Sequence, residues 1–394
     1  MKTSMIRFAP LSAALLLGLA PWAHAEDEPA TTRVARANNR FGLEVAKRAH
    51  RPGENLGISP ASLAMALHMA AEGADGETRA ELVRVLGVEG LPLGECNRLL
   101  LGQLDDQRDV TLRLANSVWS SDRCGALLPG FAEVLTRDFK AHAAVLDFDD
   151  PQSVKTINAW VSERTEGMIP ELLDRIPAEA AAYLINALYF QGSWTQAFDP
   201  KQTRPAAFTL QDGSKREVQL MHRSARARFL RDANADVVEL PYGAQGGASM
   251  WLAVPRDDAT LATLVEGLDL GTLARWSEKA HVMQGEVYLP RFKLSAKLEL
   301  SSALRAVGIE RALDAARADF TPVAERGEDL YISRVLHETV VEVDEQGTKA
   351  AAATAVELGV RGMPMTVRCD RPFLFVIQEH STGSLLFVGA VYRP

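Results

Sequence analysis

The residues with the most obvious chemistry lie in one segment, EVDEQGTKAAAATAVELGVRGMPMTV, which runs from Glu342 to Val367. Arg361 is the only arginine between Asp344 and Met365, and Gly362 follows it. An arginine side chain can pair in bidentate fashion with the carboxylate at the end of a trypsin-like specificity pocket. We therefore predict that the Arg361–Gly362 bond is a cleavage site for proteases of that specificity.

Motifs of catalysis and of metal binding are missing from the sequence. It contains no Gly-x-Ser-x-Gly elbow, no Gly-x-Gly-x-x-Gly loop and no phosphate-binding Gly-Lys-Ser/Thr. His337 and Glu338 begin a zinc-binding pattern, but Val341 stands where that pattern needs its second histidine. A hydrolase built from scattered serine, histidine and aspartate residues is the remaining enzyme hypothesis, and turnover of ester or peptide substrates would reveal it.

Residues 1–25 have the pattern of a secretory signal peptide. Lys2 and Arg7 give a basic start, Leu11 to Ala20 are almost all apolar, and Ala23-His24-Ala25 is a small-x-small cleavage site. The apolar stretch is shorter than the ~20 residues that a membrane-spanning helix needs. We therefore expect a protein that is secreted or periplasmic and has no membrane partner.

The charge balance argues against nucleic acid as a partner. The chain has a net charge of −8, and removal of Lys2 and Arg7 with the signal peptide would leave −10. Binding to phosphate backbones needs a basic surface. The most basic run, from His222 to Arg228 with Arg231 close behind, is either a polyanion site or the solvated face of a strand, and we favour the strand.

Three cysteines, Cys96, Cys124 and Cys369, are too few for a disulfide scaffold and fit no metal-ligand spacing. At most one disulfide can form. We find no Pro/Ser/Gly-rich linker and no repeat, so we predict that residues 26–394 form a single domain, although the length alone would allow two or three. We expect a monomer that needs no metal and no cofactor.

Helix signals are concentrated in the first half of the chain. Asn55 to Gly73 predicts a strand end and then a helix, with Ser59 as its N-cap, Pro60 at the first helical position and Gly73 at its end. Further helices are predicted over Glu77–Leu86, Phe131–Asp138 and Ser153–Thr165.

Strand signals dominate the second half. Ala182 to Phe190 is apolar on both faces apart from Asn186, which is typical of a central strand covered on both sides. Other strands are predicted over Ala248–Pro255, Gly285–Pro290 and His337–Asp344, and a hairpin over Phe373–Gln378 and Leu385–Tyr392. The fold class is α+β.

Several ordered motifs resemble the serpins, the serine protease inhibitor family, over essentially the whole mature chain. They are Asn55-Leu56-Gly57-Ile58-Ser59-Pro60, Asn186-Ala187-Leu188-Tyr189-Phe190-Gln191-Gly192-Ser193-Trp194, Leu289-Pro290-Arg291-Phe292, Asp329-Leu330-Tyr331-Ile332-Ser333 and Arg371-Pro372-Phe373-Leu374-Phe375-Val376-Ile377. The resemblance implies a fold of three β-sheets and about nine helices. It also implies an exposed reactive loop, here about residues 345–366.

The resemblance implies a mechanism in which a protease attacks the loop and forms an acyl-enzyme. The cleaved loop then inserts into the central sheet and carries the protease with it. In the register of the family, Glu345 begins the hinge of the loop and Arg361 precedes the scissile bond. The family also places the residues that control opening of the sheet here at Ser59, Ser62, Asn186, Trp194, Arg291 and His337, and it commonly has an ion pair at the positions of Glu345 and Arg291.

The hinge has the small residues that rapid insertion needs. Gly347 allows backbone freedom, and no long apolar or branched side chain would obstruct a parting sheet over Thr348, Ala350, Ala351, Ala352, Ala353 and Thr354. Lys349 alone is large and charged, and strand alternation puts it on the opposite face from Thr348. Without the resemblance, the alanine run would equally suit a helix or a flexible segment.

Two functions follow from the resemblance. The first is a suicide inhibitor of trypsin-like serine proteases, cut at Arg361–Gly362. The alternative is a non-inhibitory serpin that acts as a chaperone, a carrier or a decoy substrate, whose usual sign would be bulky, charged or proline residues in the hinge. Thr348 and the alanines that follow favour the inhibitor.

Overall fold

The computed structural model describes residues 28–105, 110–347 and 365–394. Within them the helices are α1 (Ala30–Ala49), α2 (Pro60–Gly73), α3 (Gly76–Leu86), α4 (Leu93–Asp105), α5 (Pro129–Phe139), α6 (Gln152–Arg164), α7 (Leu261–Glu266), α8 (Leu270–Lys279) and α9 (Ser301–Ala306). The helices expected near residues 60, 77, 131 and 153 are present with ends shifted by at most two residues. Helices α1, α4, α7, α8 and α9 were not among the predicted elements.

Helix α2 begins as its sequence predicts. The Ser59 hydroxyl accepts a hydrogen bond from the Ser62 N–H at 3.2 Å, and Pro60 is the first helical residue. The helix ends at Gly73, where a Cβ atom would lie 2.5 Å from the Val323 side chain. A residue larger than glycine would therefore push α2 away from its neighbours.

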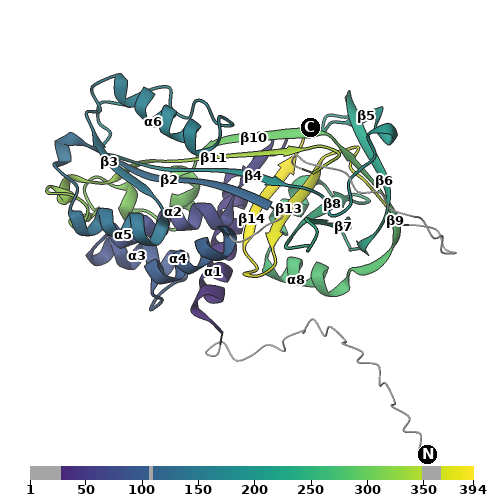
Figure 1. Cartoon of the computed structure of the whole chain (residues 1–394), viewed down its shortest axis with the longest axis horizontal. Coiled ribbons are helices and arrows are strands. Elements are labelled where there is room, and N and C mark those ends of the chain that lie inside the picture. Colours follow the sequence, from purple (N-terminus) through teal and green to yellow (C-terminus); the bar gives the residue numbers. More distant parts are fainter. Residues whose placement is uncertain (1–27, 106–109, 348–364) are drawn as a thin grey trace, which may run out of the picture.

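The first sheet has five strands in the order β10-β11-β4-β2-β3. Their bounds are β10 (Phe292–Glu299), β11 (Ile332–Val343), β4 (Ala182–Gly192), β2 (Val110–Ser121) and β3 (His142–Leu146). Figure 1 shows α6 on one side of this sheet and α2 to α5 on the other. Tyr183, Ile185 and Ala187 of β4 pack in the core under α6, whereas Leu184 and Leu188 face the main core. The prediction of a central strand covered on both faces is confirmed.

The second sheet has nine strands in the order β1-β14-β13-β8-β7-β6-β9-β12, with β5 beside β6. Their bounds are β1 (Leu56–Ile58), β5 (Arg204–Thr209), β6 (Lys215–Arg231), β7 (Ala235–Tyr242), β8 (Ala248–Pro255), β9 (His281–Pro290), β12 (Met365–Arg368), β13 (Phe373–Glu379) and β14 (Leu385–Val391). The C-terminal hairpin is present as predicted. The family resemblance implies three sheets, whereas the strands of the structure form two hydrogen-bonded networks. Strand β6 joins the parts of the larger network, because it pairs with β7 through Arg228–Arg231 and with β9 over Leu220–Phe229.

The basic run from His222 to Arg228 lies on β6, as predicted, but one of its side chains is not solvated. Arg223 is 5% exposed and lies 4.6 Å from the centre of the Phe198 ring. Strand alternation places it with Ala225 and Phe229 on the inward face. Burial lowers the pKa of Arg223 to about 10, and its Nε and Nη1 atoms have no partner among the described residues. The prediction of a solvated face is therefore wrong for this residue.

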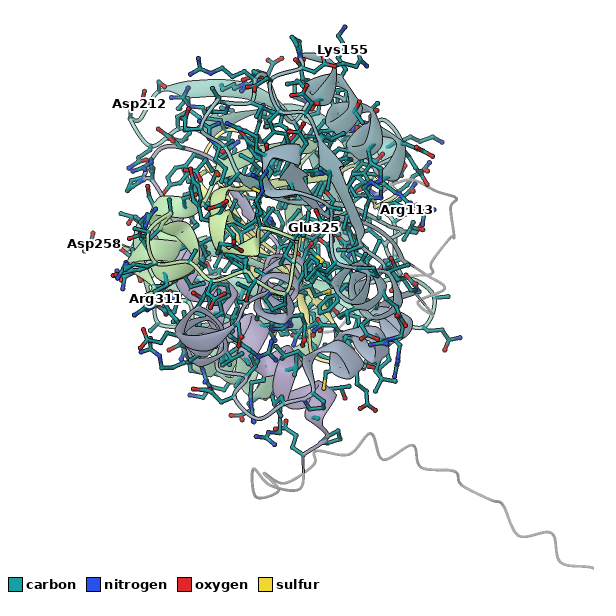
Figure 2. The ribbon with its side chains drawn as sticks, turned by 90° about the vertical axis from the view of Figure 1, so that its left-hand side faces the viewer. Arg113, Lys155, Asp212, Asp258, Arg311 and Glu325 are labelled. Carbon is teal, nitrogen blue, oxygen red and sulfur yellow. The ribbon has the colours of Figure 1, made fainter. Side chains whose placement is uncertain are left out.

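Charged side chains cover the outside of the molecule. In Figure 2 the labelled Lys155 of α6, Asp212 of the β5–β6 turn and Asp258 before α7 point outward, and all three are exposed. Within the described ranges, no helix is both long and apolar enough to cross a bilayer. The same ranges contain no cluster of side chains suited to hold a metal ion. Cys96, Cys124 and Cys369 are buried and free.

Candidate functional site

The two ends of the predicted reactive loop are held by different sheets. Its N-terminal end follows β11 in the five-stranded sheet, and its C-terminal end continues into β12, which pairs in parallel with β9. The predicted reactive and hinge residues Thr348, Ala350, Ala351, Ala352, Ala353, Arg361 and Gly362 lie outside the described residues. The site is therefore built from Glu345, Gly347 and the side chains around them.

Gly347 occupies the position where β11 and β4 end side by side. It forms antiparallel bridges with both Asp344 and Ser193. The Asp344 N–H donates to the Gly347 carbonyl at 3.0 Å, and the Trp194 N–H donates to the Gln346 carbonyl at 3.0 Å. The φ of Gly347 is +116°, and a Cβ atom there would lie 2.3 Å from the Gly192 carbonyl oxygen. Only glycine fits this position, which lies between the ends of the two strands.

Glu345 and Arg291 form the predicted ion pair. The Arg291 Nε lies 2.7 and 2.8 Å from the two carboxylate oxygens, and the Thr203 hydroxyl donates to Oε1 at 2.5 Å. The Glu345 side chain is 6% exposed and that of Arg291 46%. Burial alone would raise the pKa of Glu345, but the hydrogen bonds from Arg291 and Thr203 outweigh it and hold the pKa below its usual range.

Trp194 fixes the chain on the other side of Gly347. Its indole Nε1–H donates to the Asp344 carbonyl at 3.0 Å. Its ring stacks on Tyr242 with the centroids 4.4 Å apart, and the Phe198 N–H donates to the Glu345 carbonyl at 2.7 Å. Trp194 and Phe198 therefore hold the backbone of Asp344 and Glu345, where the hinge begins. Tyr242, Phe198 and Thr203 are parts of this site that sequence reasoning missed, and no short motif marks them.

A second cluster of polar side chains joins β11, β4 and α2 below the hinge. His337 Nδ1 lies 2.6 Å from Asn186 Oδ1, and the Ser59 N–H donates to His337 Nε2 at 3.0 Å. The Asn186 amide donates to the Ser62 carbonyl at 3.0 Å and to Asn116 Oδ1 at 2.5 Å. The four predicted residues are brought together, and all four are fully buried. The expectation that a buried asparagine on a central strand needs partners is confirmed.

The protonation state of this cluster follows from its hydrogen bonds. Because His337 Nε2 accepts from a backbone N–H, the proton of the neutral ring is on Nδ1 and is donated to Asn186. Burial lowers the pKa of His337 to about 3. Asn116, which pairs in register with Asn186 across β2 and β4, is a further member that the sequence did not reveal.

Both clusters lie along the seam between β4 and β11. The two strands are parallel neighbours, paired from Ile332 and Ala182 to Val341 and Phe190. A chain that turns back after β11 runs antiparallel to β11 and therefore also to β4. It could pair with both strands if the seam opened, and opening would break the His337–Asn186 hydrogen bond. The site is thus a closed sheet, and Gly347 bridges the ends of the two strands at one end of the seam.

Comparisons with known proteins agree with this architecture. The model of a family described as serpin (serine protease inhibitor) matches residues 36–394. A serine protease inhibitor of Cyanea capillata is 31% identical over 354 residues, which cover 86% of this chain and 93% of that protein. The crystal structure of the thermophilic serpin tengpin in its native state has a TM-score of 0.84 and 29% identity, and covers 91% of this chain and 94% of its own.

A structure of human thyroxine-binding globulin complexed with its ligand also has a TM-score of 0.84, with 25% identity over 93% of this chain and the whole of the other. The family match spans most of the sequence, so the chain belongs to the serpin family. The fold predicted from the sequence is confirmed. Because the family and the Cyanea protein are described as protease inhibitors, the chain is a member of an inhibitor family and not of an enzyme family.

Proposed function

We propose that the protein is a suicide inhibitor of trypsin-like serine proteases, cut at the Arg361–Gly362 bond. The target would attack this bond and form an acyl-enzyme. The freed segment after Gly347 would then insert between β4 and β11 before the acyl-enzyme hydrolyses. The protein itself needs no catalytic residue for this, because the protease supplies the nucleophile.

The observation that carries the proposal is the position of Gly347. Its antiparallel bridges to Asp344 and Ser193 are the first residue pairs that an inserted strand would make with β11 and β4. Insertion would then continue this pairing in the same direction as the seam between β4 and β11 opens. The small side chains of Thr348 and Ala350 to Ala353 support fast propagation from this point.

The choice of target rests on Arg361, and the compartment rests on residues 1–25. A guanidinium at the position before the scissile bond selects proteases whose specificity pocket ends in a carboxylate. The signal peptide would export the protein, so we propose a secreted or periplasmic inhibitor that meets extracytoplasmic proteases as a monomer.

The alternative is a serpin without inhibitory activity, such as a carrier. This alternative is supported by the similarity to thyroxine-binding globulin, which has the same fold and is described in complex with thyroxine. From Thr348 to Thr354 only Lys349 is large and charged and no residue is proline, which favours inhibition over this alternative.

Incubation of the purified protein with trypsin tests the proposal. We expect a covalent complex that survives denaturing electrophoresis, and none with trypsin whose catalytic serine is blocked beforehand. N-terminal sequencing of the released C-terminal peptide should begin Gly362-Met363-Pro364. Cleavage at this bond without a stable complex would favour the decoy or carrier, and cleavage elsewhere would show that the scissile bond is misassigned.

A further inference from the structure

The connection from α6 to β4, residues 165–181, lies on the face of the five-stranded sheet that α6 covers. It continues directly into β4. Its Leu172 and Leu173 belong to one apolar core with Leu336 and Val340 of β11. The connection therefore packs on both strands of the β4–β11 seam.

An ion pair joins this connection to the strand beyond the seam. The Asp174 Oδ1 atom lies 3.6 Å from the Lys297 Nζ atom, and Lys297 belongs to β10. Because the strand order is β10-β11-β4, the pair links a segment that is covalently continuous with β4 to the far side of β11. Separation of β4 from β11 would therefore stretch or break the Asp174–Lys297 pair.

A buried carboxylate lies beside this ion pair. Glu338 of β11 is the register partner of Lys297 and is 7% exposed. Its side chain has a hydrogen bond with Ser295, but its Oε2 atom has no partner in the part of the chain that the structure describes. Burial raises the pKa of Glu338 to about 7, and Lys297 and Ser295 offset only part of this effect. Two carboxylates, Glu338 and Asp174, thus compete for one lysine.

Lys297 is the charged group that acts on Glu338. The other titratable or charged side chains on the same face of the neighbouring strands are Tyr189 of β4, Lys293 and Glu299 of β10, and Arg334 and Glu342 of β11. The charged residues of α6 and of the connection are exposed. Burial raises the pKa of Tyr189, and burial lowers that of His142, which stacks on Trp160 of α6. Between about pH 6 and 8.5, Glu338 is therefore the buried group on this face that changes its charge.

We propose that Lys297 alternates between Asp174 and Glu338, and that this exchange binds the connection across the seam or frees it. With Glu338 neutral, Lys297 stays with Asp174, and Leu172 and Leu173 remain packed. An ionised Glu338 needs Lys297 or water to stabilise its charge. The first would leave Asp174 unpaired, and the second would enter beneath the connection. The consequence for inhibition rests on the proposed function, because a freed connection would let β4 and β11 part sooner after acylation.

The direction of the pH dependence follows from the raised pKa. Protonation of Glu338 stabilises the closed connection, so this stabilisation is fully present below the ordinary glutamate pKa of about 4.3. It is lost as the pH rises through about 7. His337, whose pKa is lowered by burial, acts in the opposite direction, because it destabilises the native state as the pH falls. Release of the connection at alkaline pH therefore cannot arise from His337.

Hydrogen exchange of the intact protein, followed by mass spectrometry, tests the proposal. Protection factors for residues 165–181 correct for the effect of pH on intrinsic exchange. Between about pH 6 and 8.5, we expect a roughly tenfold fall for the wild type and a change of less than about twofold for Glu338→Gln. Glu342→Gln, the matched control on the same face of β11, should follow the wild type. Asp174→Asn changes an exposed residue and should already have, at about pH 6, the low protection of the wild type at pH 8.5.

Trapping of trypsin gives a second readout. At about pH 8.5, Glu338→Gln should need at least about twice as many molecules as the wild type to trap one trypsin, and Glu338→Gln/Asp174→Asn should return to the wild-type number. The proposal fails if wild-type protection is the same at both pH values, if Glu338→Gln keeps the wild-type profile, or if Glu342→Gln flattens it equally. If neither the wild type nor any variant traps trypsin, the proposed function fails, whereas the exchange profile still decides the role of Lys297.

Discussion

Glu345 is a buried carboxylate whose charge depends on Arg291 and Thr203. The native state holds its pKa below the usual range, so the ion pair stabilises the fold at pH values above about 4.3 and this contribution is lost as the pH falls through the lowered pKa. The guanidinium of Arg291 is nearly half exposed. Solvent therefore screens the ion pair on the side of Arg291. The buried carboxylate of Glu345, in contrast, depends on Arg291 and Thr203 to stabilise its charge.

Reversal of the two charges tests this pair. Glu345→Arg or Arg291→Glu alone should lower the free energy of unfolding by about 1–3 kcal/mol, between the values for an exposed and a buried pair, and should raise the number of inhibitor molecules needed to trap one trypsin. Glu345→Arg/Arg291→Glu should recover much of both losses. Urea unfolding and inhibition stoichiometry, analysed as a double-mutant cycle, measure the coupling. Purely additive damage would contradict a functional pairing.

His337 should make the native state sensitive to acid. Its pKa is about 3 in the folded protein and near 6.5 when unfolded, so the unfolded chain binds a proton that the native state excludes. The contribution is present above pH 6.5 and is lost progressively down to about pH 3, by up to ~1.4 kcal/mol per pH unit. His337→Gln should flatten the decline of the urea midpoint in this range.

His68 provides the control for that experiment. It is also fully buried, with a pKa of about 4, but it contacts Asn97 and lies outside the β4–β11 seam. His68→Gln should remove only the share of the acid dependence that His68 contributes between about pH 6.5 and 4. The share of His337 should remain, and trapping of trypsin should be unchanged. An acid profile of His337→Gln identical to that of the wild type would contradict the assignment.

Arg361 should decide which proteases are trapped, without affecting the trapping itself. Arg361→Leu removes the charge that pairs with a trypsin-like pocket and leaves Gly347 to Thr354 unchanged. We expect the rate of trypsin inhibition to fall roughly a thousandfold or more, while chymotrypsin- or elastase-like enzymes become targets. Second-order inhibition rates against the three proteases measure the change. Undiminished inhibition of trypsin would remove the basis for the proposed specificity.

At the scale of elements, β4 and β11 form a seam that must separate for a strand to insert. Each residue of an inserted strand directs its side chain to one of the two faces of the sheet. Trp194, Gly347 and the Glu345–Arg291 pair lie at the mouth of this seam, and the cluster around Asn186 and His337 lies further along it. If β4 and β11 separate from this end, the first residue pairs of the seam part before the hydrogen-bonded cluster around Asn186 and His337 must break.

Thr348→Arg should convert the inhibitor into a substrate. A long charged side chain directly after Gly347 would slow insertion, so the acyl-enzyme would hydrolyse first. The matched control is Lys349→Arg, which places the same side chain on the opposite face, where a large cation already stands. Electrophoresis after reaction with trypsin should show cleaved protein for Thr348→Arg and covalent complex for Lys349→Arg. Unchanged trapping by Thr348→Arg would mean that hinge insertion is not the mechanism.

At the scale of the whole molecule, the proposed mechanism requires a native state that is not the most stable one. An inserted strand would add about a dozen ladder hydrogen bonds, which at 0.5–1.5 kcal/mol each come to roughly 6–18 kcal/mol. This is comparable with the total stability of a typical domain. The intact protein would then persist because the seam opens slowly.

Cleavage at Arg361–Gly362 should therefore make the protein more resistant to heat. We expect the thermal unfolding midpoint of the trypsin-cleaved wild type to exceed that of the intact protein by at least about 10 °C. Cleaved Thr348→Arg should show a smaller gain. Calorimetry of intact and cleaved protein measures both. An equal or lower midpoint after cleavage of the wild type would indicate that the cut loop does not insert.

The features predictable from the sequence are those with local signals. The N-cap Ser59 and Pro60 mark the start of α2, apolar residues on both faces mark β4 as central, and the isolated arginine marks the proposed scissile bond. Each signal lies within a few residues of what it specifies, because capping, strand alternation and side-chain size act over such distances. Even the Glu345–Arg291 pair was expected only from the family resemblance.

Only the tertiary structure decided which distant residues meet. Asn116 completes the cluster around Asn186, and Thr203 binds Glu345, across 70 and 142 residues of sequence. Arg223 is buried against Phe198 although its neighbours in the basic run suggested a solvated strand. Strand periodicity distinguishes two faces but does not say which one meets the core. That choice depends on the register and packing of whole sheets, where long-range burial outweighs the local preference of any one side chain.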